Sequence, residues 1–261
     1  MIVRQDNDCF ILISQDHHAR LAGALAEQWG NESFNRLDHY LKTAIDLHDF
    51  GWVGLDSDPR WNEEKGVPYS FLDEPLERRI PAYRMGIDYA VEQDAYAGLL
   101  CSLHYTSFYP ARVAVELGPI VESFVADETL RQADLMRQVE PLKTKQDVEH
   151  DLGVLKLLDN LSLYACLNAP GAAKADEHPW YRQGFAATPV KVAGGGIETV
   201  RFTSGWKDDH LIVLDPFPFA GPAHTEIEFR KVARDNVSDH GYAQAAARTP
   251  WETLALTWFH V

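Results

Sequence analysis

The chain lacks any run of 18 consecutive apolar residues, which is about the length that a membrane-spanning helix needs. Its first residues also lack the basic segment and following apolar segment of a signal peptide. Only three cysteines occur, Cys9, Cys101 and Cys166, and they lie far apart among apolar neighbours. A disulfide framework or a cysteine-based zinc site is therefore not expected. These absences predict a cytoplasmic protein with no membrane partner and with reduced thiols in its core.

Basic residues are scarce as well. The 261 residues include 24 Lys and Arg against 39 Asp and Glu, which gives a formal net charge of −15. A surface this acidic repels the phosphates of a nucleic-acid backbone, so no nucleic-acid partner is expected. The apolar share of 46% is ordinary for a globular protein, and a chain of this length can bury a sizeable core.

The first 170 residues show mainly helical periodicity. Apolar residues recur every three or four positions and predict helices over about residues 16–29, 33–50, 81–108, 120–139 and 145–167. Asp16 is the expected N-cap of the first helix, and Pro81 the first-turn residue of the third. Residues 51–80 contain several prolines and four aromatic residues, which predicts a long but ordered loop.

Both ends of the chain are β-prone. Residues 1–14 predict a hairpin, and short β-prone runs occur at 188–192, 198–203, 210–214, 225–230 and 253–260. A lone hairpin is only marginally stable, so we expect it to join the C-terminal strands. The predicted fold class is α+β, with a hairpin over 1–14, a helical core over 15–170 and a β-rich part over 171–261, interleaved as one unit.

Five polar residues fall on the apolar faces of the predicted helices, where burying them unpaired is costly. They are His18, His48, Asp49, His104 and Asp159. A single residue of this kind is more often a hydrogen-bonded core residue or a helix cap than a metal ligand. Together, imidazoles and carboxylates in a helical core are what a divalent cation requires, and the cation offsets the cost of burying them.

Other histidines fit this set less well. His17 points about 100° away from His18 on the same helix, which favours a solvated position, with a role as the true ligand as the alternative. His39 and His150 lie two and a half turns before His48 and Asp159, so both are expected on the opposite, surface side.

The order of these residues resembles the metal-binding pattern of the HD-domain superfamily. More narrowly, the chain resembles the uncharacterised bacterial family known as domain of unknown function 3891. The matching segments are Gln15–Ala22 (QDHHARLA), His48–Trp52 (HDFGW), Tyr69–Leu72 (YSFL), Ser102–His104 (SLH) and Asp159–Leu163 (DNLSL). The predicted hairpin and β-rich tail also suit that family, so the resemblance covers most of the chain and implies an HD-like helical core.

The resemblance implies roles for the same residues. His18, His48, Asp49 and Asp159 would bind a divalent metal ion such as Mn, Mg, Fe, Zn or Ni. In HD hydrolases the metal polarises a phosphate group and activates water, and here Asp49 or His104 would assist that water. Many HD phosphohydrolases carry a Lys three residues after the Asp of the pair, where this chain has Trp52.

Three functions therefore remain open from the sequence. The first is metal-dependent hydrolysis of a small phosphate ester, the second an HD-like iron oxygenase, and the third a non-catalytic ligand-binding protein with a structural or degenerate site. For a small-molecule substrate the candidate binding residues are Trp52, Trp61 and Arg84, with packing or surface ion pairs as the alternative. Arg78 and Arg79 share that anion-binding interpretation with Arg84.

Overall fold

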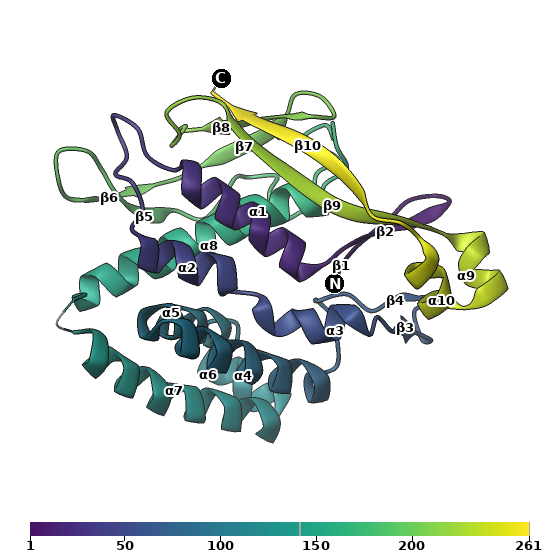
Figure 1. Ribbon diagram of the computed structural model, residues 1–261, viewed down its shortest axis with the longest axis horizontal. Helices are drawn as coiled ribbons and strands as arrows, with labels where there is room; N and C mark the ends of the chain where they lie inside the picture. The colour runs from purple at the N-terminus through teal and green to yellow at the C-terminus, as the bar shows by residue number, and fades with distance from the viewer. Residues whose placement is uncertain (141, 261) are drawn as a thin grey trace.

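The computed structural model describes residues 1–140 and 142–260 and shows an α+β fold with a six-stranded sheet on one side of a set of helices (Figure 1). Neighbouring strands are antiparallel except β10 and β8, which are parallel. The spatial order of the sheet is β1 (Ile2–Gln5), β2 (Cys9–Ile13), β9 (Ala223–Ala233), β10 (Glu252–Phe259), β8 (Leu211–Asp215) and β7 (Thr203–Trp206).

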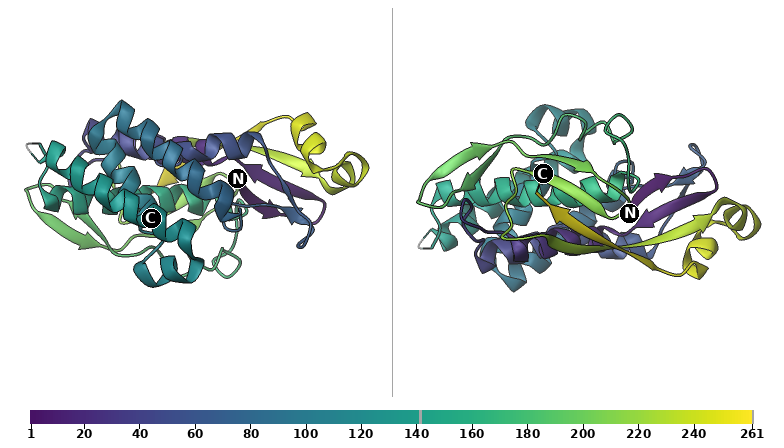
Figure 2. Two further views of the ribbon diagram at one scale, coloured as in Figure 1. Left: turned by 90° about the horizontal axis from the view of Figure 1, so that it is seen from below. Right: turned by 90° about the horizontal axis from the view of Figure 1, so that it is seen from above.

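The N-terminal hairpin pairs with the C-terminal strands, as expected. Strand β2 lies antiparallel to β9, with Phe10 opposite Val232 and Leu12 opposite Arg230. The apolar side chains of Phe10, Leu12 and Val232 are fully buried, so the pairing covers apolar surface that an isolated hairpin would expose. Figure 2 shows the N-terminal hairpin alongside β9 in the sheet. The division into three parts at residues 14 and 170 stays a prediction.

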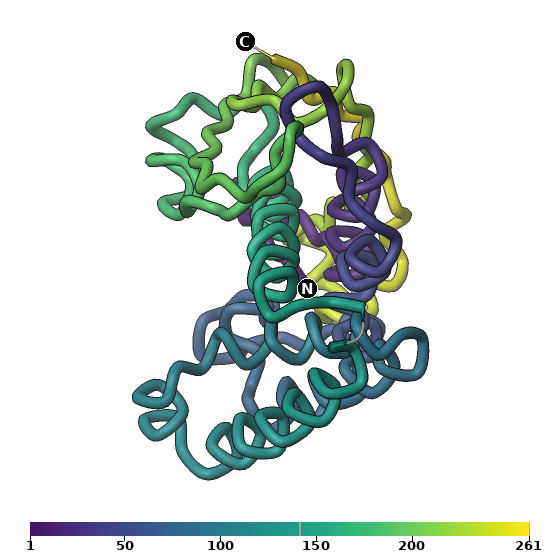
Figure 3. The backbone as a smooth tube through the Cα atoms, turned by 90° about the vertical axis from the view of Figure 1, so that its left-hand side faces the viewer, coloured from purple at the N-terminus to yellow at the C-terminus, as the bar shows by residue number. Residues whose placement is uncertain are grey.

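The helices lie in successive layers beneath the sheet (Figures 1 and 3). Helix α1 contacts β9 on one side and both α8 and α2 on the other, and α2 in turn contacts α5. The helices of the two layers are α1 (Gln15–Gln28), α2 (His39–Leu47), α8 (Lys145–Leu167), α4 (Leu76–Gln93), α5 (Ala95–Thr106), α6 (Ala111–Leu117) and α7 (Pro119–Val139). Because α1, α2, α5 and α8 pack on one another, polar residues on their inner faces are brought together.

Shorter elements fill the connections. They are η1 (Phe50–Trp52), α3 (Val53–Ser57), the hairpin of β3 (Trp61–Asn62) and β4 (Val67–Pro68), the hairpin of β5 (Thr188–Lys191) and β6 (Ile197–Val200), α9 (Arg234–His240) and α10 (Tyr242–Arg248). Cys101 and Cys166 are buried free thiols, and Cys9 is a half-buried one. Within the described part of the chain, no helix is both long and apolar enough to cross a membrane.

Several predicted boundaries are wrong for local reasons. Ser14, and not Asp16, caps α1, because its hydroxyl accepts from the backbone N–H of His17 at 3.1 Å. Helix α2 starts at His39, and not near residue 33, because Asp38 accepts from the N–H of Leu41. The predicted helix over 81–108 is two helices, since Asp94 leaves the helical conformation and caps α5 through the N–H groups of Tyr96 and Ala97.

The predicted loop over 51–80 contains more structure than its prolines suggest. It holds η1, α3, the β3–β4 hairpin and the first turn of α4, so Pro81 lies inside a helix instead of opening one. Helix α8 spans Lys145–Leu167, which confirms the prediction, and helix α7 begins at Pro119, one residue before the predicted start. The helices α6, α9 and α10 are absent from the predictions.

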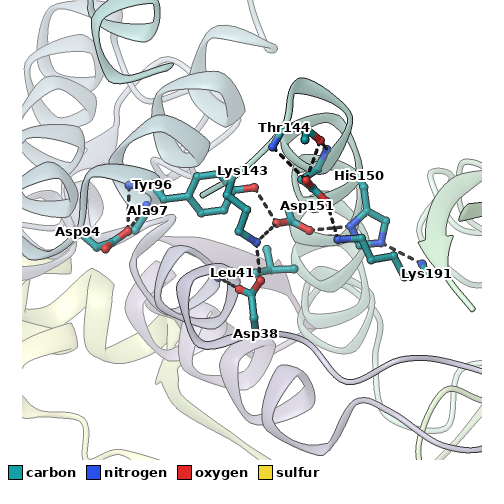
Figure 4. A network of polar contacts seen from close by, with 11 residues as sticks. Asp38, Leu41, Asp94, Tyr96, Ala97, Lys143, Thr144, His150, Asp151 and Lys191 are labelled. Atoms are coloured by element: carbon teal, nitrogen blue, oxygen red, sulfur yellow. Dashed lines mark hydrogen bonds and ion pairs between the residues drawn. The ribbon is translucent and has the colours of Figure 1, made fainter. Parts of the chain in front are cut away.

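A buried polar network holds the start of α8 against α2 and α5 (Figure 4). Lys143 Nζ donates to Asp151 Oδ2 at 2.9 Å and also pairs with Asp38, the cap of α2. Tyr96 of α5 donates its hydroxyl to the same Asp151 oxygen at 2.6 Å. The other oxygen accepts from His150 Nδ1, while His150 Nε2 accepts from a backbone N–H of β5. His150 is therefore buried, in contrast to the surface position expected for it, and is occupied by structural contacts.

We expect Asp151→Asn to lower the free energy of unfolding by about 3 kcal/mol at pH 7, because it removes the buried one of the two acidic partners of Lys143. Burial raises the pKa of Asp151, but the bonds from His150, Tyr96 and Lys143 outweigh burial and leave the pKa below its ordinary value. The stabilisation is thus present above the unfolded pKa of about 3.9 and is lost as pH falls below it. Chemical denaturation from pH 7 to pH 3 should show that the free energies of unfolding of the two proteins converge below about pH 4.

The matched control is Glu27→Gln, which breaks an exposed ion pair with Lys42. That change should alter the free energy of unfolding by less than about 1 kcal/mol at every pH. A difference in the free energy of unfolding between Asp151→Asn and the parent protein that stays constant down to pH 3 would contradict this role of the Asp151 carboxylate.

Candidate metal centre

Four polar side chains meet where α1, α2 and α8 pack together. His18 comes from α1, His48 and Asp49 directly follow α2, and Asp159 comes from α8. His18 Nε2 lies 3.2 Å from His48 Nε2, 3.2 Å from Asp49 Oδ2 and 3.3 Å from Asp159 Oδ1. His48 Nε2 lies 3.7 Å and 3.6 Å from the same two carboxylate oxygens. Both imidazoles are fully buried, and the carboxylates are nearly so.

The outer nitrogens of the two imidazoles are already engaged. His48 Nδ1 donates to the carbonyl oxygen of Ile45 at 2.6 Å. Ser162 donates its hydroxyl hydrogen to the carbonyl of Asp159, so its oxygen is free to accept from His18 Nδ1 at 2.6 Å. Both neutral rings therefore carry their hydrogen on Nδ1 and turn the bare lone pair of Nε2 toward the centre.

Four acceptor atoms with no hydrogen between them repel one another unless a positive charge lies among them. The five separations that involve an imidazole nitrogen are 3.2–3.7 Å, which suits ligands of one metal ion. A regular tetrahedron with edges of about 3.4 Å has its centre about 2.1 Å from each corner, which is the distance of imidazole nitrogen and carboxylate oxygen from a bound transition metal. The residues present thus fit a single divalent ion held by two imidazoles and two carboxylates.

The electrostatics of the cluster also favour a cation. Burial alone lowers the pKa of His48, but Asp49 and Asp159 raise it to about 9. The same carboxylates raise the pKa of His18 against the effect of burial. Burial would raise the pKa of Asp49 and Asp159, yet the two histidines hold both pKa values below their ordinary range. A cation at the centre would satisfy the carboxylates that otherwise draw protons onto the imidazoles.

His104 of α5 adjoins the cluster without entering its centre. Its Nε2 lies 3.7 Å from Asp159 Oδ2, on the oxygen that does not face His18. Two overlapping triplets, His18–His48–Asp49 and His48–His104–Asp159, place their potential ligand atoms within 4.8 Å of one another. Burial lowers the pKa of His104 to about 4, so the ring is neutral near pH 7. Its Nδ1 is buried without a partner.

A close glycine contact sets the position of the His48–Asp49 segment. A Cβ on Gly51 would lie 2.4 Å from the carbonyl oxygen of Ala82, and one on Gly86 would lie 2.6 Å from the backbone nitrogen of Gly51. Helix α4 can therefore approach η1 only because both residues lack a side chain. This contact fixes the backbone immediately after Asp49.

A cavity of about 320 Å³ opens beside the cluster. Asp49, His104 and Asp159 are among its polar lining residues, and Trp52, Tyr83 and Phe108 are among its aromatic ones. Trp52 is buried and lines this cavity, and its role in binding a substrate stays a prediction. An ion at the cluster would be reachable from this cavity through its two carboxylate ligands.

The other predicted substrate-binding residues lie elsewhere, which corrects their assignment. Trp61 packs edge-on against Phe10 and beside Tyr242, because the β3–β4 hairpin folds onto the sheet and α10. Arg84 pairs with Asp127 of α7, since α4 turns it away from the cavity. His17 pairs with Glu228 of β9 at 2.9 Å and does not take part in the cluster.

The sequence reasoning also omitted three residues that hold the cluster. Ser162 sets the orientation of His18, and its position three residues after Asp159 was the available signal. Gln15 Nε2 donates to Asp49 Oδ2 at 3.2 Å, and Tyr105 donates to Asp49 Oδ1 at 3.3 Å. Nothing in the helical periodicity distinguishes these two from ordinary core-facing residues.

Comparison with known proteins gives one match. Neither the curated proteins nor the solved structures include a significant match to this chain. A family model described as "protein of unknown function (DUF3891)" matches residues 1–234, a span that contains the whole cluster and most of the sheet. The chain therefore belongs to this family of proteins of unknown function.

Proposed function

We propose that His18, His48, Asp49 and Asp159 bind one divalent metal ion and that the protein is a metal-dependent hydrolase acting on a small phosphate ester. The observation that carries the proposal is the set of inward-facing Nε2 and carboxylate oxygens beside a cavity of about 320 Å³. The order of the residues along α1, α2 and α8 supports an HD-like arrangement of the helical core.

Two imidazoles and two carboxylates suit a transition metal such as Mn, Fe, Zn or Ni better than Mg, which prefers oxygen ligands. When bound, the metal would polarise the phosphate group and make a water molecule acidic enough to attack it. In that hydrolysis the water oxygen forms a new bond to phosphorus, the bond from phosphorus to the ester oxygen breaks, and the alcohol leaves with a proton.

The protein's own groups have separate tasks in this reaction. Gln15 and Tyr105 hold the carboxylate of Asp49, so that its orientation does not depend on the ligand in the cavity. Ser162 holds the ring of His18. His104 is neutral and reaches the cavity, so it can accept a hydrogen bond from a water molecule or donate one to the leaving oxygen.

A second candidate is an iron-dependent oxygenase with the same ligands. The observation that favours it is Trp52, which lines the cavity at the position where many HD phosphohydrolases have a lysine. Two imidazoles with a carboxylate are also the donor set of non-haem iron(II) oxygenases. Metal analysis with phosphatase and oxygen-consumption assays separates the two candidates, and a cluster that takes up no metal would favour the non-catalytic alternative.

We expect Asp49→Asn to weaken binding of Mn²⁺ or Zn²⁺ at least a hundredfold, measured by calorimetric titration, because one anionic ligand is lost. Metal should raise the melting temperature of the parent protein and not that of the variant. Asp16→Asn, at a half-buried residue of α1 that pairs with Arg20 and lies outside the cluster, is the control and should behave as the parent. If Asp49→Asn lowers the melting temperature equally with and without metal, Asp49 makes an ordinary buried hydrogen bond and is not a metal ligand.

The change His104→Ala should leave metal stoichiometry intact while reducing turnover of 4-nitrophenyl phosphate about a hundredfold, since it removes a proton-transfer group and not a ligand. Metal content by mass spectrometry and initial rates provide the two readouts. Loss of the metal in this variant would make His104 a ligand, whereas unchanged turnover would make it a packing residue.

For Ser162→Ala we expect metal affinity to fall about tenfold to a hundredfold, because the ring of His18 loses the acceptor that fixes its hydrogen on Nδ1. Ser107→Ala, at the exposed end of α5, is the matched control. An affinity equal to that of the parent protein would show that packing alone orients His18.

A further inference from the structure

One arginine beside the cavity has no acidic partner. Arg79 donates from Nη1 to the carbonyl oxygen of Phe71 at 3.2 Å, and its Nε is buried with no acceptor. Its neighbours on α4 differ, because Arg78 pairs with Glu74 and Asp58 and Arg84 pairs with Asp127. Among residues 1–140 and 142–260, no carboxylate forms an ion pair with Arg79.

Arg79 lies on the same cavity as the metal cluster. The ring of Tyr83 stacks on Tyr105 at 4.0 Å, and the hydroxyl of Tyr105 reaches Asp49. Burial raises the pKa of Tyr83 and Tyr109, and the nearby charge of Arg79 acts in the opposite direction on both. Arg79 is thus a cation that faces two phenol groups and the cavity, on the wall that leads to Asp49.

Two further polar atoms in this cavity lack partners. Gln15 Oε1 and His104 Nδ1 are shielded from water, and both side chains are at least nine-tenths buried. With Arg79 Nε, three buried polar atoms without a hydrogen-bond partner belong to residues that line this one cavity. Arg79, the positively charged one of these residues, is the hydrogen-bond donor suited to an anionic group.

The rest of the cavity is aromatic. Trp52, Phe71, Phe108 and Trp180 line it together with the tyrosines. A volume of about 320 Å³ is at the lower end of the range for small-molecule sites. Flat aromatic walls around a small space select a planar, mostly apolar group.

We propose that Arg79 binds the phosphate of the substrate and that the substrate is a monoester of phosphate with a small aromatic alcohol. This inference rests on the proposed function for the metal. A guanidinium donates to two phosphate oxygens through its planar fork, and a phosphate monoester has a third terminal oxygen for a cation. The aromatic walls hold the ring of the alcohol.

The test is binding of phenylphosphonate, which has the same shape but a phosphorus–carbon bond that water does not cleave under assay conditions. Calorimetric titration of the Mn²⁺-loaded protein should show that Arg79→Gln weakens binding at least tenfold. Arg84→Gln, which removes a paired arginine outside the cavity, should change it less than twofold. Methylphosphonate, without the ring, should bind the parent protein at least tenfold more weakly than phenylphosphonate.

Arg79→Lys provides a second variant that keeps the charge and loses the planar fork. Its affinity for phenylphosphonate should lie between those of the parent protein and Arg79→Gln. Equal binding by Arg79→Gln and the parent, or no binding by the parent at millimolar phenylphosphonate, would overturn the inference. Phenyl phosphate that binds through Arg79 but is not hydrolysed would instead overturn the proposed hydrolase and leave the anion site in place.

Discussion

Four hydrogen-bond acceptors face one another inside the protein, and this group is the main physical constraint on the structure. The Nδ1 hydrogens of His18 and His48 are used by Ser162 and by the carbonyl of Ile45, so both Nε2 lone pairs point inward at two carboxylates. In a buried environment this arrangement is stable only with positive charge at its centre. A metal ion supplies that charge, because the separations between the imidazole nitrogens and the carboxylate oxygens match its bond lengths. In the absence of the ion, protons on the imidazoles supply it.

The layers of the fold serve to hold this centre. Helix α1 lies between the sheet and the other helices, so that His18 meets residues from α2 and α8. The network of Lys143 and Asp151 fastens the start of α8 to α2 and α5, two turns before Asp159. The glycine contact between η1 and α4 places Asp49 and at the same time brings Arg79 of α4 to the cavity. Cluster and cavity therefore share one framework.

Helical periodicity was sufficient to place the polar residues of the cluster, because each lies three or four residues from apolar residues that must be buried. It predicted α8 fully and the strands approximately. It failed at Asp94 and Asp38, where a single side chain caps a helix and overrides the apolar pattern. Gln15 and Tyr105 escaped prediction because their roles depend on contacts between helices that no spacing along one helix records. The candidate binding residues Trp61 and Arg84 lie away from the cavity, which the spacing along one helix could not show either.

The most direct test of the central claim is a crystal structure of the Mn²⁺- or Zn²⁺-loaded protein with an anomalous-difference map measured at the absorption edge of the metal. The account predicts one strong peak about 2.0–2.3 Å from His18 Nε2, His48 Nε2 and one oxygen each of Asp49 and Asp159. A map without a peak there, with the histidines still hydrogen-bonded to both carboxylates, would contradict it.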